Sequence, residues 1–99
     1  MAGEKYKDAP TPGLGSLVLV KFSFADEEGN IVEERQFQGA IEKISEEEVV
    51  LRHPSNGAEV TLPPYFGSYE PAPKGEYQLK STGETIVDPD YITEWTLRV

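Results

Sequence analysis

The segment SLVLVKFSF, residues Ser16–Phe24, decides the fold. Every second residue from Val18 to Phe24 is apolar, so these side chains would share one face of an extended strand. The opposite face begins apolar and becomes polar from Lys21 onwards. A period of two is typical of a half-buried strand, and the first half of this strand is predicted to be covered on both sides.

The rest of the chain repeats this pattern in short segments separated by turns. The pair Asn56-Gly57 favours a tight hairpin turn, because both residues tolerate positive φ. Gly39 interrupts an alternating segment and predicts a bulge or a sharp bend in one long strand. No segment longer than eight residues has a convincing helical period. Further strands are expected over residues 31–45 with an interruption at Gly39, and over residues 49–53, 58–62, 76–81, 84–87 and 91–99.

Six to seven short strands at intervals of about 8–12 residues are typical of an all-β protein. The size of the chain and the bend at Gly39 favour a small, strongly bent β-barrel or roll, SH3-like or OB-like. Residues 16–99 are expected to form this single domain, and residues 1–15, rich in proline and glycine, a flexible arm. The predicted core consists of Val18, Val20, Phe22, Phe24, Phe37, Ile41, Val60, Leu62, Tyr77, Leu79, Trp95 and Leu97.

Eighteen acidic and nine basic residues give the chain a net charge of −9. A field of this sign repels nucleic-acid phosphates and anionic membrane surfaces, so neither is an expected partner. A basic protein would be attracted, and its association would be fast and sensitive to salt. The alternative is that the charge only keeps the protein soluble. The sequence has no targeting segment and no apolar run as long as a membrane span, which favours a cytoplasmic location.

Residues suited to catalysis or metal binding are sparse. His53 is the single histidine and is expected to lie exposed at a strand end. The absence of cysteine removes zinc ligands, and the acidic segments 26–28 and 88–90 lack the spacing of a calcium loop. We therefore expect a non-enzymatic protein with no catalytic residue, metal or cofactor. The alternatives are a small-ligand binder or enzyme with a carboxylate pair in the barrel mouth, and a homo-oligomeric module of unknown role whose edge strands pair.

The segment Pro63–Pro73 gathers three aromatic side chains among four prolines. The prolines exclude a strand or long helix there and leave room for one short 3-10 turn. Because proline and tyrosine lose little entropy on ordering, the segment is suited to recognition. The alternative is that Tyr65 and Phe66 plug one end of the barrel. The candidate partner-binding residues are Tyr65, Phe66, Tyr69 and Glu70, with Glu46, Glu47 and Glu48 attracting a basic partner.

The C-terminal third carries three short motifs, with Leu62-Pro63-Pro64 upstream: Gly75-Glu76-Tyr77, Ser81-Thr82-Gly83-Glu84 and Asp88-Pro89-Asp90. This third resembles small uncharacterised bacterial β-barrel proteins, and the resemblance implies no activity. In size, charge and strand pattern the chain is also similar to barrel-type immunity proteins, which block a partner toxin. That similarity of type implies a role as an immunity or inhibitor protein that neutralises a basic partner.

Overall fold

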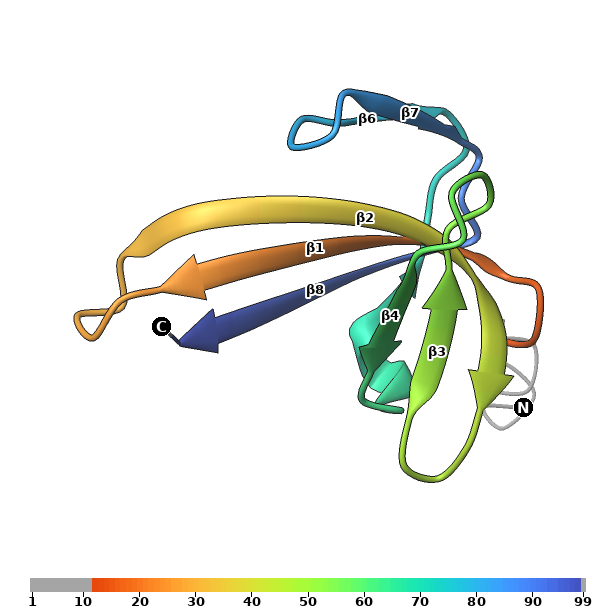
Figure 1. Ribbon diagram of the computed structural model, residues 1–99, viewed down its shortest axis with the longest axis horizontal. Coiled ribbons are helices and arrows are strands. Elements are labelled where there is room, and N and C mark those ends of the chain that lie inside the picture. Colours follow the sequence, from red (N-terminus) through yellow and green to blue (C-terminus); the bar gives the residue numbers. More distant parts are fainter. Residues whose placement is uncertain (1–11, 99) are drawn as a thin grey trace, which may run out of the picture.

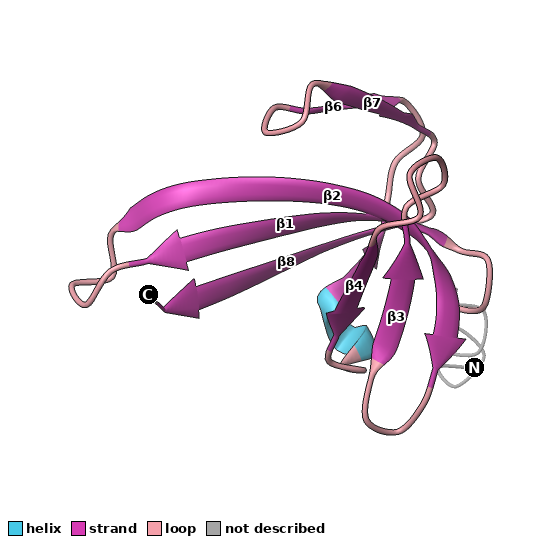
Figure 2. Ribbon diagram, viewed as in Figure 1, coloured by secondary structure: helices cyan, strands magenta, loops and turns pink. Residues whose placement is uncertain are grey.

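The computed structural model describes residues 12–98, which form an all-β protein with one short 3-10 turn (Figures 1 and 2). The all-β prediction is confirmed. The elements are β1 (Leu17–Ala25), β2 (Ile31–Ile44), β3 (Val49–Arg52), β4 (Glu59–Leu62), the turn η1 (Phe66–Ser68), β5 (Tyr69–Pro71), β6 (Glu76–Leu79), β7 (Glu84–Val87) and β8 (Tyr91–Arg98).

Six strands form one mixed sheet in the order β4-β3-β2-β1-β8-β5, and β6 and β7 form a separate hairpin. The hairpin is tied to β2 through Ser81, whose Oγ accepts a hydrogen bond from the Gln36 amide (2.8 Å) and whose amide donates to Gln36 Oε1 (3.0 Å). β4 and β5 are the two end strands, and the pairings of residues 12–98 include none between them. The sheet is thus open in the described structure.

β2 is 14 residues long and curves strongly as it passes from one neighbour to the next (Figure 1). Ala40 marks the change of neighbour, because it pairs with Leu17 of β1 on one side and with Arg52 of β3 on the other. A single strand therefore links the part of the sheet formed with β1 and β8 to the part formed with β3 and β4, termed here the folded end.

The sequence predicted a bulge or bend at Gly39, and Gly39 does lie next to Ala40, where β2 changes from one neighbouring strand to the other. A Cβ atom on Gly39 would lie 2.8 Å from Phe37 Cε2 and 3.0 Å from Leu51 Cβ, so no larger residue fits without a shift of its neighbours. The break in strand register lies a little farther along, between Ile41 and Lys43. The glycine thus allows close packing at the curve, and the following residues form the irregularity.

The last strand is fixed beside the first by a pair of short contacts. The Leu17 amide donates to Asp90 Oδ2 (2.7 Å), and the Asp90 amide donates to the Leu17 carbonyl (2.8 Å). These bonds set the parallel register of β8 on β1, in which Val18 lies opposite Tyr91. β1 is therefore held by an antiparallel neighbour on one side and a parallel neighbour on the other.

The core lies at the folded end, where β3 and β4 pack beneath the first halves of β1 and β8. A second small buried pair, Leu79 and Ile86, lies in the β6–β7 hairpin. The main core consists of eight buried side chains: Val18, Val20, Ile41, Val49, Leu51, Leu62, Tyr69 and Tyr91.

Five of the twelve predicted core residues are buried, six are partly buried and one is exposed. Val18, Val20, Ile41, Leu62 and Leu79 are buried. Phe22, Phe37, Val60 and Trp95 pack against the core but stay partly exposed, and Phe24 and Tyr77 are also only partly buried. For Leu97 the prediction is wrong, since its side chain is 45 % exposed.

The proline-rich segment departs from expectation at one point. The 3-10 turn is present as η1, but the three residues that follow form the strand β5, which raises the count to eight strands in the described chain. Pro71 is accommodated because β5 is an end strand and needs no partner on its outer side.

Most of the expected flexible arm, residues 1–11, lies outside the described residues. Residues 12–15 are tied to the sheet: Pro12 is buried, and the Gly15 amide donates to the Ile41 carbonyl at 2.8 Å. The described chain is thus held to the sheet from Pro12 onwards.

Candidate binding surface

The outer parts of β1, β2 and β8 continue beyond the core as a three-stranded ribbon, on the left in Figure 1. One face of this ribbon, termed here the inner face, carries Val18 and Val20 at its base and Phe22 and Phe24 farther out. Strands β3 and β4 cover only the base. In residues 12–98 no further layer covers the outer half, so its apolar side chains meet solvent.

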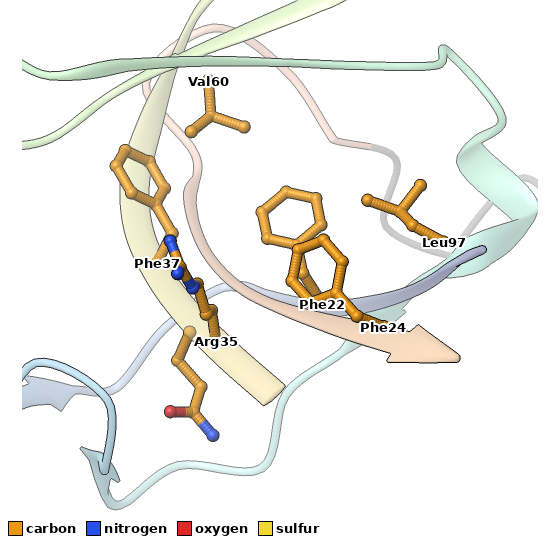
Figure 3. Close-up of a pocket in the computed structure, with 7 residues that line it drawn as sticks. Phe22, Phe24, Arg35, Phe37, Val60 and Leu97 are labelled. Atoms are coloured by element: carbon orange, nitrogen blue, oxygen red, sulfur yellow. The ribbon is translucent and has the colours of Figure 1, made fainter. Parts of the chain in front are cut away.

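A hollow of about 380 Å³ lies on the inner face and is termed the inner groove. Figure 3 shows Phe22 and Phe24 close together, Leu97 beside Phe24, and Val60 opposite them on β4. Exposed apolar side chains that cluster in this way mark interaction sites more often than single exposed ones. The residues that line the groove are Phe22, Phe24, Arg35, Gln36, Phe37, Val60 and Leu97.

The wall that β2 provides is charged. The β1–β2 register places Arg35 opposite Phe22 and Glu33 opposite Phe24, and Arg35 Nε forms an ion pair with Glu33. Two charged residues thus face inward along β2. The β8 side of the same face carries Trp95 and Leu97, so the groove is most apolar towards β8.

A second hollow, of about 210 Å³, lies on the opposite, outer face and is termed the outer hollow. It is lined by Ser68, Glu70, Ile92 and Glu94. Glu70 pairs with Ile92 across the β5–β8 ladder, which makes Glu94 its diagonal neighbour. Lys21 lies opposite Glu94 on β1, and its pKa is raised chiefly by its hydrogen bond to Glu34, with a smaller effect of Glu94.

The whole excess of acidic residues lies within residues 12–98. Residues 12–98 contain 16 acidic and seven basic side chains, so the whole net charge of −9 lies there. Four of these seven cations already form ion pairs, so they do little to offset charge elsewhere. The pairs are Lys21–Glu34 (3.1 Å), Arg35–Glu33, Lys43–Glu48 (3.5 Å), and Arg52 with both Glu42 (2.9 Å) and Glu59 (2.7 Å).

The three aromatic residues of the candidate loop divide between surface and interior. Tyr65 is 67 % exposed. Phe66 and Tyr69 pack edge to face with ring centroids 5.5 Å apart, and Tyr69 is buried with its hydroxyl donating to the Pro63 carbonyl (3.2 Å). Burial raises the pKa of Tyr69 to about 12. Of the two residues of the plug alternative, Phe66 packs against the core and Tyr65 is exposed, while the candidate partner-binding residue Tyr69 is buried.

The acidic candidates lie in two places. Glu46, Glu47 and Glu48 form the turn between β2 and β3, and pairing of Val49 with Leu62 puts this turn at the end of the sheet where the Tyr65 segment begins. Glu70 is elsewhere, in the outer hollow. The β3–β4 pairing thus places the glutamate turn at the end of the sheet where the Tyr65 segment begins, whereas Glu70 lines the outer hollow. The binding role of all seven residues stays a prediction.

His53 is buried, and the expectation of an exposed strand end is wrong. Its Nδ1 accepts hydrogen bonds from the amides of Ser55 (3.2 Å) and Asn56 (3.3 Å), so Nε2 carries the proton and donates to Glu84 Oε2 (2.8 Å). The imidazole thus joins the β3–β4 turn to β7. Burial favours a raised pKa of Glu84, but hydrogen bonds, first that of His53 and then that of Gln38, hold the pKa below its usual value.

Sequence reasoning missed the inner groove, although it singled out several of its residues as core. The strand alternation that identifies Phe24 and Leu97 as inward-facing carries no information on whether a second layer covers them. Their position beyond the reach of β4 is visible only in the folded chain.

Several features are absent from residues 12–98. No group of three His, Cys, Asp or Glu side chains is placed to hold a metal ion, and no Asp or Glu is buried. No helix in the same range is long and apolar enough to cross a membrane.

Comparison with known proteins finds no relative: no protein-family model matches the chain, and no curated protein or solved structure matches it.

Proposed function

We propose that this chain is a non-enzymatic, acidic protein-binding domain that takes a basic protein through the inner groove. The observation that carries the proposal is the apolar groove, with Phe24 and Leu97 at the solvent, on a domain of net charge −9. Apolar contact supplies most of the free energy of association in such sites, and complementary charge supplies speed and selectivity.

In this proposal the predicted glutamates attract the basic partner, and Tyr65 makes a second contact with it outside the groove. Glu46 and Glu47 are exposed in the β2–β3 turn, and Tyr65 stands at the same end of the sheet. A basic partner would be steered by these carboxylates over distances of about one Debye length, roughly 8–10 Å. Aromatic anchoring in the groove would then hold it.

An immunity or inhibitor role is the specific form of this proposal, with the bound basic partner neutralised by obstruction of its own site. A barrel-like roll, a bacterial origin and a cytoplasmic location belong to the same proposal. The curvature of β2 at Gly39 supports the roll, because it carries β3 and β4 beneath the base of the sheet.

Capture from a lysate of the source organism tests the proposal, with retained proteins identified by mass spectrometry. The immobilised wild-type chain should retain a basic protein at low salt and release it at high salt. Phe24→Ser should lose that protein. Val32→Ser is the matched control, because Val32 is an exposed apolar residue of the same ribbon (59 % exposed) and does not line the groove.

The outcomes separate cleanly. Retention by the wild type and by Val32→Ser, with loss in Phe24→Ser, supports binding in the groove. Equal retention by all three chains overturns the groove as the site, and retention of no basic protein at low salt overturns the basic partner.

A further inference from the structure

The outer half of β8 is an unpaired sheet edge. β8 pairs with β1 along its whole length, but β5 pairs only with Tyr91–Thr93 on the other side. The chain turns away into η1 just before β5, so in the described structure no strand lies beside Glu94–Arg98. In Figure 1 this part of β8 forms the lower edge of the ribbon. Unpaired amide and carbonyl groups on such an edge are a template for another strand.

The two edges of the ribbon differ in how they are protected. On β2, Glu33 and Arg35 face inward, and the Gln36 amide is already bonded to Ser81. Both features oppose the pairing of another strand with this edge. On β8, the inward residues are Trp95 and Leu97, and the open stretch contains no proline. The β8 edge therefore has the composition of a strand that is paired in the working protein.

The open stretch is self-complementary. Its described part, Glu94–Arg98, has five residues with Thr96 at their centre. In an antiparallel pair of two copies centred on Thr96, Glu94 of each copy would lie opposite Arg98 of the other on the outer face. Trp95 would lie opposite Leu97 on the inner face, because directly opposite residues share a face.

We propose that two copies of this chain form a symmetric dimer by antiparallel pairing of their β8 edges, centred on Thr96. The structure limits the register on one side, since β5 occupies the position opposite Thr93 and prevents pairing farther towards Tyr91. The six-stranded sheets of the two copies join into one, and the two inner grooves meet at the dyad. Each Glu94 then lies between Lys21 of its own copy and Arg98 of the other.

Charge favours this register over others. Among residues 12–98 Arg98 forms no ion pair with a carboxylate of its own copy, and the centred register places it opposite Glu94 of the other copy. The net charge of −9 per copy opposes association, and the dimer is accordingly expected to strengthen with added salt.

Sedimentation velocity of the pure chain, from about 1 µM to about 500 µM, tests the proposal with four chains. The wild type should be dimeric at the upper end. Arg98→Glu would place Glu94 opposite a second glutamate and should weaken dimerisation at least about tenfold. The double variant Glu94→Arg, Arg98→Glu restores opposite charges across the dyad but sets two cations together at Lys21, so it should dimerise more tightly than Arg98→Glu alone. Lys80→Glu makes the same change of net charge at an exposed position away from the edge, so as the control for added repulsion it should weaken dimerisation less than Arg98→Glu.

Hydrogen exchange gives a second measurement, because amides of Glu94–Arg98 should exchange more slowly at dimer-forming concentrations than at low concentration. A wild-type chain that stays monomeric throughout overturns the proposal, as does a double variant that dimerises no more tightly than Arg98→Glu, or an effect of Lys80→Glu equal to that of Arg98→Glu. None of these results bears on capture of a basic protein, because no partner is present in the sample.

Discussion

The aromatic ring of Phe37 lies against the backbone of Gly39, so that a Cβ on the glycine would come within 2.8 Å of Phe37 Cε2. Phe37 also lines the inner groove and packs edge to face with buried His53, with ring centroids 5.8 Å apart. The missing side chain of Gly39 thus allows the curve of β2 and sets the position of one wall of the groove.

Gly39→Ala should lower the free energy of unfolding by about 1–3 kcal/mol, because the added methyl group must displace Phe37 or Leu51 in a packed region. Urea denaturation followed by circular dichroism measures the change. Gly67→Ala is the control, since a Cβ on Gly67 meets no atom within 4 Å and should change stability by less than about 0.5 kcal/mol. Equal losses in the two variants would show that the close approach at Gly39 is unimportant.

Leu97→Thr should cost less than about 1 kcal/mol of stability, because the side chain is 45 % exposed and threonine suits a strand. Val20→Ala removes fully buried methyl groups from the same sheet and should cost about 2–3 kcal/mol. Thermal unfolding of both variants distinguishes a surface residue from a core residue. A loss for Leu97→Thr as large as that for Val20→Ala would contradict the exposed groove.

Acid should weaken the contact between His53 and Glu84. Hydrogen bonds hold the pKa of Glu84 below its usual value of 4.5, so this carboxylate stabilises the fold above that pH. The stabilisation by the Glu84 carboxylate is lost as the pH falls from 4.5 through the lower pKa that Glu84 has in the folded state. The difference in unfolding free energy between wild type and Glu84→Gln should therefore be largest near pH 7 and shrink below pH 4.5.

The matched control for this pH series is Glu47→Gln, which changes an exposed carboxylate in the β2–β3 turn and should show a smaller difference at neutral pH. A difference for Glu84→Gln that is independent of pH between 7 and 3 would show that ionisation of Glu84 does not stabilise the fold.

Thr93→Val should stabilise the protein by about 0.5–2 kcal/mol. Thr93 is 1 % exposed, and its hydroxyl has no hydrogen-bond partner among residues 12–98. Valine has nearly the same shape and removes a buried polar atom that loses its bond to water on folding. Denaturant unfolding measures the gain, and a destabilised Thr93→Val would show that the hydroxyl makes a stabilising bond.

The strand pattern could be predicted from the sequence because alternation, turn residues and Gly39 are local features. The segment Ser16–Phe24 and the turn at Asn56-Gly57 carry their conformations in their own residues. β5 could not be predicted in this way. Its three residues become a strand only because β8, twenty residues later, offers them an edge.

The candidate site was harder to predict, because exposure depends on how far one layer reaches over another. Leu97 and Val20 follow the same alternation, yet β3 and β4 cover only Val20. His53 is a similar case. Its partner Glu84 is 31 residues away, and nothing in the sequence around His53 points to that contact.

The parallel contact of β1 with β8 has a consequence for the order of folding. The Leu17–Asp90 bond joins residues separated by 73 positions, so β1 gains its second neighbour only after residues 91–98 have been synthesised. Such distant contacts make the conformational search slow, on the scale of about milliseconds to seconds. Until β8 pairs with it, β1 exposes one edge, and unpaired strand edges of this kind promote aggregation during folding.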